Sequence, residues 1–201
     1  MTDRLSADSA GIDRAAALLR GGALVAFPTD TVYGVGCRAG DPEALARIFA
    51  AKRRPLDRAV PMLVPDLAAA VGSDYAADDR AIRLAAHFWP GGLTLILPST
   101  TGGASQAFRA PDHQVALALL TAAGRLATSS ANRSGEPETL DADDVLIAFA
   151  DSDEPSAVVD GGRVPGGVAS SVLDLSGDRP QLIREGAVAR GEIEALIGPI
   201  D

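Results

Sequence analysis

The chain has little of what several classes of protein require. Its 201 residues include one cysteine, Cys37, and two histidines, so neither an internal disulfide nor a zinc cluster of soft ligands can form. No apolar run reaches the ~18 residues of a transmembrane helix. The first residues lack the basic and then apolar pattern of a signal peptide, and we therefore expect a cytoplasmic protein with no membrane contact. Cys37 follows an apolar stretch and is predicted to be a small buried side chain.

Lysine is almost absent, since the 18 basic residues are seventeen arginines and Lys52. An ammonium is a compact point charge and a guanidinium is a planar fork, and the two are not interchangeable where geometry matters. In Lys52-Arg53-Arg54-Pro55 a lysine lies close to an arginine, a combination that suits a polyphosphate or a carboxylate. A cation at the end of a helix can also simply complement the helix dipole. Lys52 and Arg54 are therefore candidates whose role depends on the rest of the chain.

The net charge of −9 and the pI near 4.7 argue against a surface for nucleic acid, which needs a basic patch to displace counterions from phosphates. A small anion needs only a local pocket of positive charge. The sequence has no Gly-x-x-x-x-Gly-Lys-Ser/Thr loop and no Gly-x-Ser-x-Gly elbow, which excludes P-loop nucleotide enzymes and gives no support to a covalent serine mechanism.

Hydrophobic periodicity and capping residues predict alternating helices and strands. Helices are expected over residues 8–20, 41–52, 77–88, 112–123, 142–150 and 190–197, and strands over 23–27, 60–64, 93–97, 125–129, 157–159, 172–175 and 181–184, with a short extended piece around Phe108 and Arg109. This alternation indicates an α/β fold, and the closely spaced last strands indicate a mixed sheet. With no repeat and no long linker, residues 1–201 are predicted to form a single domain with its core at about 10–190.

Polar clusters follow several of the expected elements. They are Thr29 to Thr31, Lys52 to Arg54, Ser130 with Asn132, and Ser170-Ser171. Each alone is ordinary turn chemistry, because such side chains bond to their own backbone. In open α/β sheets ligands bind beyond the strand ends, and we therefore expect these clusters to converge on one edge of the sheet.

Five motifs occur in order: Pro28-Thr29-Asp30-Thr31-Val32-Tyr33-Gly34, Lys52-Arg53-Arg54-Pro55, Phe88-Trp89-Pro90-Gly91-Gly92-Leu93-Thr94, Arg109-Ala110-Pro111-Asp112-His113, and Ser129-Ser130-Ala131-Asn132-Arg133-Ser134-Gly135. Together they resemble the YrdC family, the L-threonylcarbamoyl-adenylate synthases, from about residue 10 to residue 190. Ser170-Ser171-Val172 and Arg184-Glu185-Gly186 match the family's late motifs. The resemblance implies a YrdC-like fold, a twisted mixed sheet flanked by helices, in the short form without the extra C-terminal domain.

The resemblance also implies an activity: formation of threonylcarbamoyl-adenylate and pyrophosphate from L-threonine, bicarbonate and ATP. A separate transferase complex then moves the threonylcarbamoyl group onto a tRNA adenosine. Carried over by position, Lys52 and Arg54 are catalytic. The positions expected to bind L-threonine are Thr31, Arg109, Ser130 and Ser170, and those expected to bind ATP are Lys52, Arg54, Ser105, Asn132 and Arg184. No protein-held metal is expected, because the Mg²⁺ of ATP is held mostly by phosphate oxygens.

Elementary electrostatics agrees with these assignments. The carbamate formed from threonine must approach the α-phosphorus of ATP, and two anions repel strongly in a dry pocket. Lys52 and Arg54 would screen them and stabilise the charge that develops on phosphorus. The rest of the task is alignment of nucleophile and leaving group.

The chain departs from the family pattern at three places. Arg53 replaces a usual glycine, which is tolerable if its backbone is not left-handed; Arg58-Ala59 replaces Asn-Pro, and Leu140 replaces a polar residue near the nucleotide. Two alternatives to the synthase are a paralogue that acts on another carbamate and an RNA-binding module, the latter opposed by the charge of −9. The glycine-rich loop 161–169 is either a mobile cover for the site or an inert turn.

Overall fold

The computed structural model of the chain describes residues 2–53, 60–165 and 167–201. Its strands are β1 (Asp3–Ser6), β2 (Val25–Pro28), β3 (Tyr33–Arg38), β4 (Met62–Leu63), β5 (Leu93–Leu97), β6 (Gln106–Arg109), β7 (Leu126–Ser130), β8 (Ala157–Asp160), β9 (Ser171–Asp174) and β10 (Gln181–Arg184). Its helices are α1 (Ser9–Arg20), α2 (Pro42–Lys52), α3 (Leu67–Val71), α4 (Asp79–Phe88), α5 (Gln114–Ala123), α6 (Ala142–Ala148) and α7 (Arg190–Ile197). None of these helices is long and apolar enough to cross a membrane.

Aspartates begin most of the helices. Asp8, Asp41, Asp66, Asp78 and Asp141 each occupy the N-cap, where the carboxylate accepts a hydrogen bond from a backbone N–H of the first turn. Such a cap stabilises a helix by about 1 kcal/mol relative to alanine, which explains why these helices begin within two residues of where the sequence predicts them, apart from the unexpected α3.

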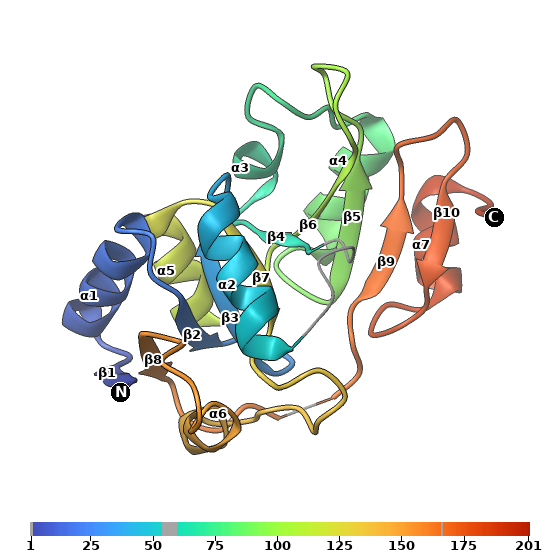
Figure 1. Cartoon of the computed structure of the whole chain (residues 1–201). Helices are drawn as coiled ribbons and strands as arrows, with labels where there is room; N and C mark the ends of the chain where they lie inside the picture. Colours follow the sequence, from blue (N-terminus) through green and yellow to red (C-terminus); the bar gives the residue numbers. More distant parts are fainter. Residues whose placement is uncertain (1, 54–59, 166) are drawn as a thin grey trace.

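In the described part of the chain the strands form one ten-stranded sheet in the order β1-β8-β2-β3-β7-β4-β6-β5-β9-β10 (Figure 1). Pairings of both directions occur: β8 is parallel to β1 and β2, whereas β3 is antiparallel to β2 and β7. The predicted mixed α/β sheet is therefore confirmed. Helix α1 packs against α5, and α4 against α7, so that separate helix pairs cover different parts of the sheet.

Strand β3 is absent from the sequence prediction, which treated Thr29 to Gly34 as a loop beyond a strand end. The structure shows that residues 29–32 are instead the turn of a β2–β3 hairpin. Gly34 and Gly36 weaken the strand pattern of β3, but packing leaves little room for a Cβ at either position. A Cβ on Gly34 would lie 2.8 Å from Cγ2 of Thr128 on the neighbouring β7. Cys37 in β3 is buried as expected, and burial raises the pKa of its thiol to about 11.

Candidate functional site

A cavity of about 440 Å³ opens on one face of the sheet. Side chains alternate between the two faces of a strand, and every second residue of four neighbouring strands points into the cavity. These lining residues are Pro61 and Leu63 at β4, Thr94 and Ile96 of β5, Ala107 and Arg109 of β6, and Ser170 and Val172 at β9. The intervening Leu93, Leu95, Phe108 and Leu173 belong to the apolar core on the opposite face.

The predicted location of the site is therefore corrected, because the polar clusters meet over a sheet face and not at an edge. Thr31 reaches the cavity from the β2–β3 turn, and Ser130 reaches it from the end of β7. Thr31, Arg109, Ser130, Ser170 and Arg184 all line the one cavity, as the resemblance implied for residues of a single site.

Thr29 shapes the turn that carries Thr31. Its side chain is 5% exposed, and its hydroxyl donates to the carbonyl of Val32 at 2.7 Å and accepts from the Thr31 N–H at 3.3 Å. A hydroxyl that bonds its own turn in this way rigidifies the backbone. Thr31 is thereby held at the cavity while the neighbouring Asp30 turns toward β6.

Arg109 is the buried cation of the cavity, with 8% of its surface exposed. Its Nε donates to the carbonyl of Gly91 at 2.9 Å, and its Nη2 donates to the Asp30 carboxylate at 2.5 Å. Among the described residues Nη1 has no partner. One edge of the guanidinium is thus fixed by the protein, and the Nη1–Nη2 edge can bind a ligand carboxylate in bidentate fashion.

Two buried side-chain atoms lack a hydrogen-bond partner among the described residues: Oδ1 of Asp30, the carboxylate that pairs with Arg109, and Nδ1 of His113, whose imidazole interacts electrostatically with Asp30. Burial lowers the pKa of His113, against a smaller raising effect of the Asp30 carboxylate. The imidazole is therefore neutral at pH 7, which leaves Arg109 as the positive charge in this part of the site.

A one-residue bulge decides which way Arg184 points. On the neighbouring β9, Leu182 lies opposite Leu173, but Arg184 lies opposite Val172, so that Ile183 is the extra residue. In a regular strand Ile183 would face Val172 and Arg184 would face the core, because a slip of one residue exchanges the faces. The bulge turns Arg184 into the cavity, where its guanidinium donates to the Ser170 carbonyl at 2.8 Å and 3.0 Å.

The two serines that precede and begin β9 have different tasks. The Ser170 hydroxyl faces the cavity and lies 2.9 Å from the hydroxyl of Thr94. The Ser171 hydroxyl is fully buried and accepts from Gly186 N–H at 2.8 Å while it donates to the carbonyl of Val188 at 2.5 Å. Ser171 therefore ties β9 to the segment after β10, whereas the Ser170 hydroxyl, which also accepts from Nη2 of Arg184 at 3.3 Å, faces the cavity.

Lys52 ends α2 and is 2% exposed. Its ammonium donates to the Ser130 carbonyl, to the carbonyl of Asn132 at 2.5 Å and to Oδ1 of Asn132 at 3.2 Å. The Ser130 hydroxyl in turn donates to Oδ1 of Asn132 at 2.6 Å. Lys52 thus meets the predicted Ser130 and Asn132, and its ammonium lies behind the Ser130 segment of the cavity wall.

The remaining predicted site residues either lie outside the described residues or do not line the cavity. Arg54 and Arg58-Ala59 lie outside the described residues. Ser105 is exposed in the loop before β6 and does not line the cavity, and Asn132 is buried behind Ser130. The backbone of Arg53 is left-handed, with φ 52° and ψ 43°. This conformation disfavours any residue with a Cβ, so the replacement of glycine by Arg53 carries strain. Gly167 and Ala169 of the 161–169 loop reach the cavity wall.

Sequence reasoning gave no role to three residues of the site. Asp30 holds Arg109, Thr94 supports Ser170, and Glu138 contributes the carboxylate of the cavity wall. Thr94 carried a usable signal, as the polar residue of the otherwise apolar strand Leu93-Thr94-Leu95-Ile96-Leu97. Glu138 carried none, because acidic residues are common in loops.

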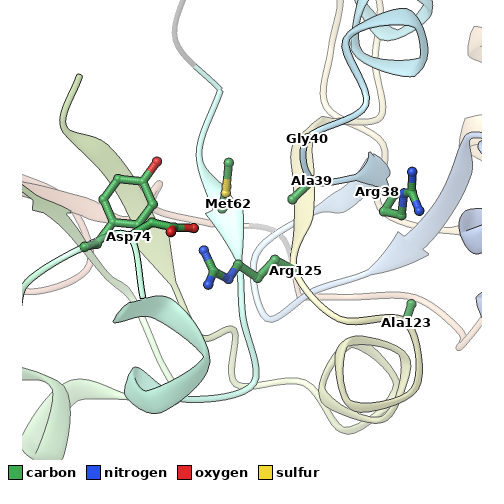
Figure 2. Close-up of a pocket in the computed structure, with 8 residues that line it drawn as sticks. Arg38, Ala39, Gly40, Met62, Asp74, Ala123 and Arg125 are labelled. Carbon is green, nitrogen blue, oxygen red and sulfur yellow. The ribbon is translucent and has the colours of Figure 1, made fainter. Parts of the chain in front are cut away.

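Two further hollows lie elsewhere on the molecule. One of about 420 Å³ is lined by Arg38, Met62, Asp74, Tyr75 and Arg125, and Figure 2 shows the Arg125 side chain extending toward Met62 and Asp74. Met62 alternates with Pro61 and Leu63, so this hollow lies on the other face of β4. Another, of about 470 Å³, adjoins the Asn132 turn and is lined by both Glu136 and Glu138. None of the predicted site residues that the structure describes lines either hollow.

The sequence matches a known protein family. The model of the family of Sua5, yciO and yrdC proteins, described as "Telomere recombination", matches residues 17–186. Threonylcarbamoyl-AMP synthase of Bacillus subtilis is 41% identical over all of the chain, which spans 60% of that protein. Threonylcarbamoyl-AMP synthase of Chromohalobacter salexigens is 36% identical, with 80% of the chain covering 90% of that protein.

A solved structure matches as well. The crystal structure of P. abyssi Sua5 complexed with L-threonine superposes with a TM-score of 0.89 at 36% identity. The match covers 100% of the present chain and 62% of the P. abyssi chain. The family match covers most of the residues from α1 to β10, including all five cavity residues that the motifs predicted. The chain belongs to the Sua5/YciO/YrdC family.

Proposed function

We propose that the chain is an L-threonylcarbamoyladenylate synthase, a nucleotidyltransferase that forms threonylcarbamoyl-AMP and pyrophosphate from L-threonine, bicarbonate and ATP. The observation that carries the proposal is the free Nη1–Nη2 edge of Arg109 in a cavity lined by hydroxyls. A carboxylate bound at that edge places the rest of a small hydroxy amino acid among Thr31, Ser130 and Ser170. The names of the relatives and the threonine-bound P. abyssi structure support this choice of substrate.

The reaction joins two anions. The threonine amine loses a proton and adds to carbon dioxide derived from bicarbonate, which gives a carbamate; a carbamate oxygen then bonds to the α-phosphorus of ATP, and the bond to pyrophosphate breaks. Arg184 faces the cavity from the side opposite Ser130 and is assigned to the ATP phosphates, together with Arg54. These cations lower the repulsion between carbamate and triphosphate.

Lys52 has a double role in this proposal. Its ammonium fixes the Ser130–Asn132 turn through hydrogen bonds to both residues, and its positive charge lies directly behind the cavity wall. Asn132 is assigned to ATP along with Ser105. The buried charge favours an anion at Ser130 even without direct contact, because low-dielectric surroundings screen it poorly.

Mg²⁺ is expected to accompany ATP. Mg²⁺ prefers oxygen ligands, keeps several waters and commonly takes one or two carboxylates in addition to substrate phosphates. The described residues offer no group of three or more metal-ligating side chains, but Glu138 supplies one carboxylate to the cavity wall. This donor set fits an ion brought in by ATP, which neutralises triphosphate charge when bound.

The product would pass to a separate complex that transfers the threonylcarbamoyl group to tRNA, which places the reaction in the cytoplasm. A direct and stable contact with RNA is not part of the proposal, given the net charge of −9. A paralogue that acts on another carbamate is the competing function, and Arg109 argues against it. A carbamoyl group without an amino-acid carboxylate would leave that guanidinium edge without a partner.

The test is pyrophosphate release from ATP by the purified protein, with bicarbonate and magnesium present, comparing L-threonine, L-serine and no amino acid. Release that requires both threonine and bicarbonate is expected. Release that is absent with threonine, or equal without it, would refute the synthase and redirect the search to other carbamates. Arg109→Gln serves as the matched variant, and its KM for threonine should rise strongly while its affinity for ATP stays close to that of the wild type.

A further inference from the structure

Glu138 is the one carboxylate among the described residues that line the 440 Å³ cavity, where the other charged side chains are Arg109 and Arg184. It also lines the 470 Å³ hollow beside the Asn132 turn, so it stands in the wall that the two spaces share. Its carboxylate makes no hydrogen bond or ion pair with the described residues. An acid in this position is unexpected in a site for two anions.

The backbone on both sides of Glu138 is fixed. Thr139 is 3% exposed, its hydroxyl donates to the Ala131 carbonyl at 3.2 Å, and its carbonyl accepts from the Tyr33 N–H at 2.9 Å. On the other side, the Asn132 amide donates to the carbonyl of Glu136 at 2.7 Å. The backbone at Glu138 is therefore held between the β2–β3 hairpin and the turn that Lys52 supports, and the exposed Glu138 side chain extends from this fixed backbone.

An unpaired carboxylate on the wall repels a triphosphate, and this repulsion becomes attraction when a divalent cation lies between the two. We propose that Glu138 is the protein ligand of the Mg²⁺ that enters with ATP. The proposal rests on the proposed function, since it assumes that ATP occupies this cavity. Glu136, two residues earlier, lines only the neighbouring hollow and has no such role.

The proposal predicts that Glu138→Gln changes the affinity for an ATP analogue in opposite directions without and with a divalent cation. Without a divalent cation, Glu138→Gln removes a repulsive charge. An ATP analogue with a non-cleavable α,β-bridge should therefore bind to the variant about two- to fivefold more tightly than to the wild type, which is the effect expected for an exposed pair of charges. With Mg²⁺, the same variant lacks a metal ligand, and the analogue should bind about tenfold more weakly. Glu136→Gln should match the wild type in both conditions.

The experiment is isothermal titration of the three proteins with α,β-methylene-ATP, once in EDTA and once in Mg²⁺, with the thermal midpoint of each protein as the check on folding. An effect of Glu138→Gln in the same direction under both conditions, or an equal effect of Glu136→Gln, would overturn the assignment of Glu138. Wild-type protein that binds the analogue under neither condition would instead overturn the proposed function, and the metal site with it.

Discussion

Replacement of the single lysine is the perturbation with the sharpest structural expectation. In Lys52→Met the side chain keeps its length and apolar stem but loses the ammonium, whose N–H groups bond to oxygens of Ser130 and Asn132. Each buried acceptor left unsatisfied costs about 1–3 kcal/mol. Relief of the ammonium's own burial offsets part of this, because a buried charge is itself costly. We expect a net loss of about 2–4 kcal/mol in the free energy of unfolding.

The assays are thermal unfolding and threonine-dependent pyrophosphate release. A loss of that size corresponds to a fall in Tm of roughly 5–15 °C for a chain of this length. Pyrophosphate release should fall to a small fraction of wild type even well below the lowered Tm, because the Ser130–Asn132 turn loses both its support and the nearby charge. Lys52→Arg should also be impaired, since a planar guanidinium does not fit the site of a compact ammonium.

The matched control is Arg53→Gln, which removes the neighbouring cation. The Arg53 side chain is 71% exposed, and its ion pair with Asp151 is exposed as well, so its loss should cost less than about 1 kcal/mol. A Lys52→Met protein with wild-type Tm and wild-type pyrophosphate release would refute the reasoning, because the hydrogen bonds of Lys52 would then support neither the turn nor the reaction.

Two other predictions follow from local features. The left-handed backbone of Arg53 disfavours any side chain, so Arg53→Gly should raise the free energy of unfolding by about 1 kcal/mol in urea denaturation; an unchanged or lower value would show that the residue is not strained. Burial raises the pKa of Tyr33 to about 12, compared with about 10 in the unfolded chain. As pH rises through that interval the unfolded state loses its proton first, and stability should fall by about 1.4 kcal/mol per pH unit. Tyr33→Phe should lack this fall between pH 10 and 12. At neutral pH its free energy of unfolding should be lower by about 1 kcal/mol, because the hydrogen bond to Gly162 is lost. An equal loss of stability of the two proteins at alkaline pH would contradict the raised pKa of Tyr33.

Local sequence signals predicted the helices well because their causes are local. Asp41 with Pro42 marks the start of α2, and the last helix occupies the predicted residues 190–197. The signals failed where pairing between distant segments decides the outcome. Strand β3 contains two glycines that are explained by the close approach of Thr128 in β7, which lies far away in the sequence, with Phe27 of β2 also near Gly36.

The candidate residues show the same division. Composition alone drew attention to Lys52. The order of the motifs pointed to Arg109, Ser130, Ser170 and Arg184, because such motifs can be recognised in the sequence without a structure. Tertiary structure decided where the cavity residues meet. Alternation along the strands directs Arg109 of β6 and Ser170 before β9 to one sheet face, Ser130 reaches that face from the end of β7, and the bulge in β10 turns Arg184 toward it.

The clearest case of that dependence is the end of the chain around β10. The sequence by itself determined that a strand covers residues 181–184 and that an arginine closes it. Which face the arginine occupies was decided by the bulge at Ile183, a property of the register between β9 and β10. Glu138 likewise has a candidate role only because it lines the cavity. Register and packing join residues that are distant in sequence, and no local pattern of side chains contains that information.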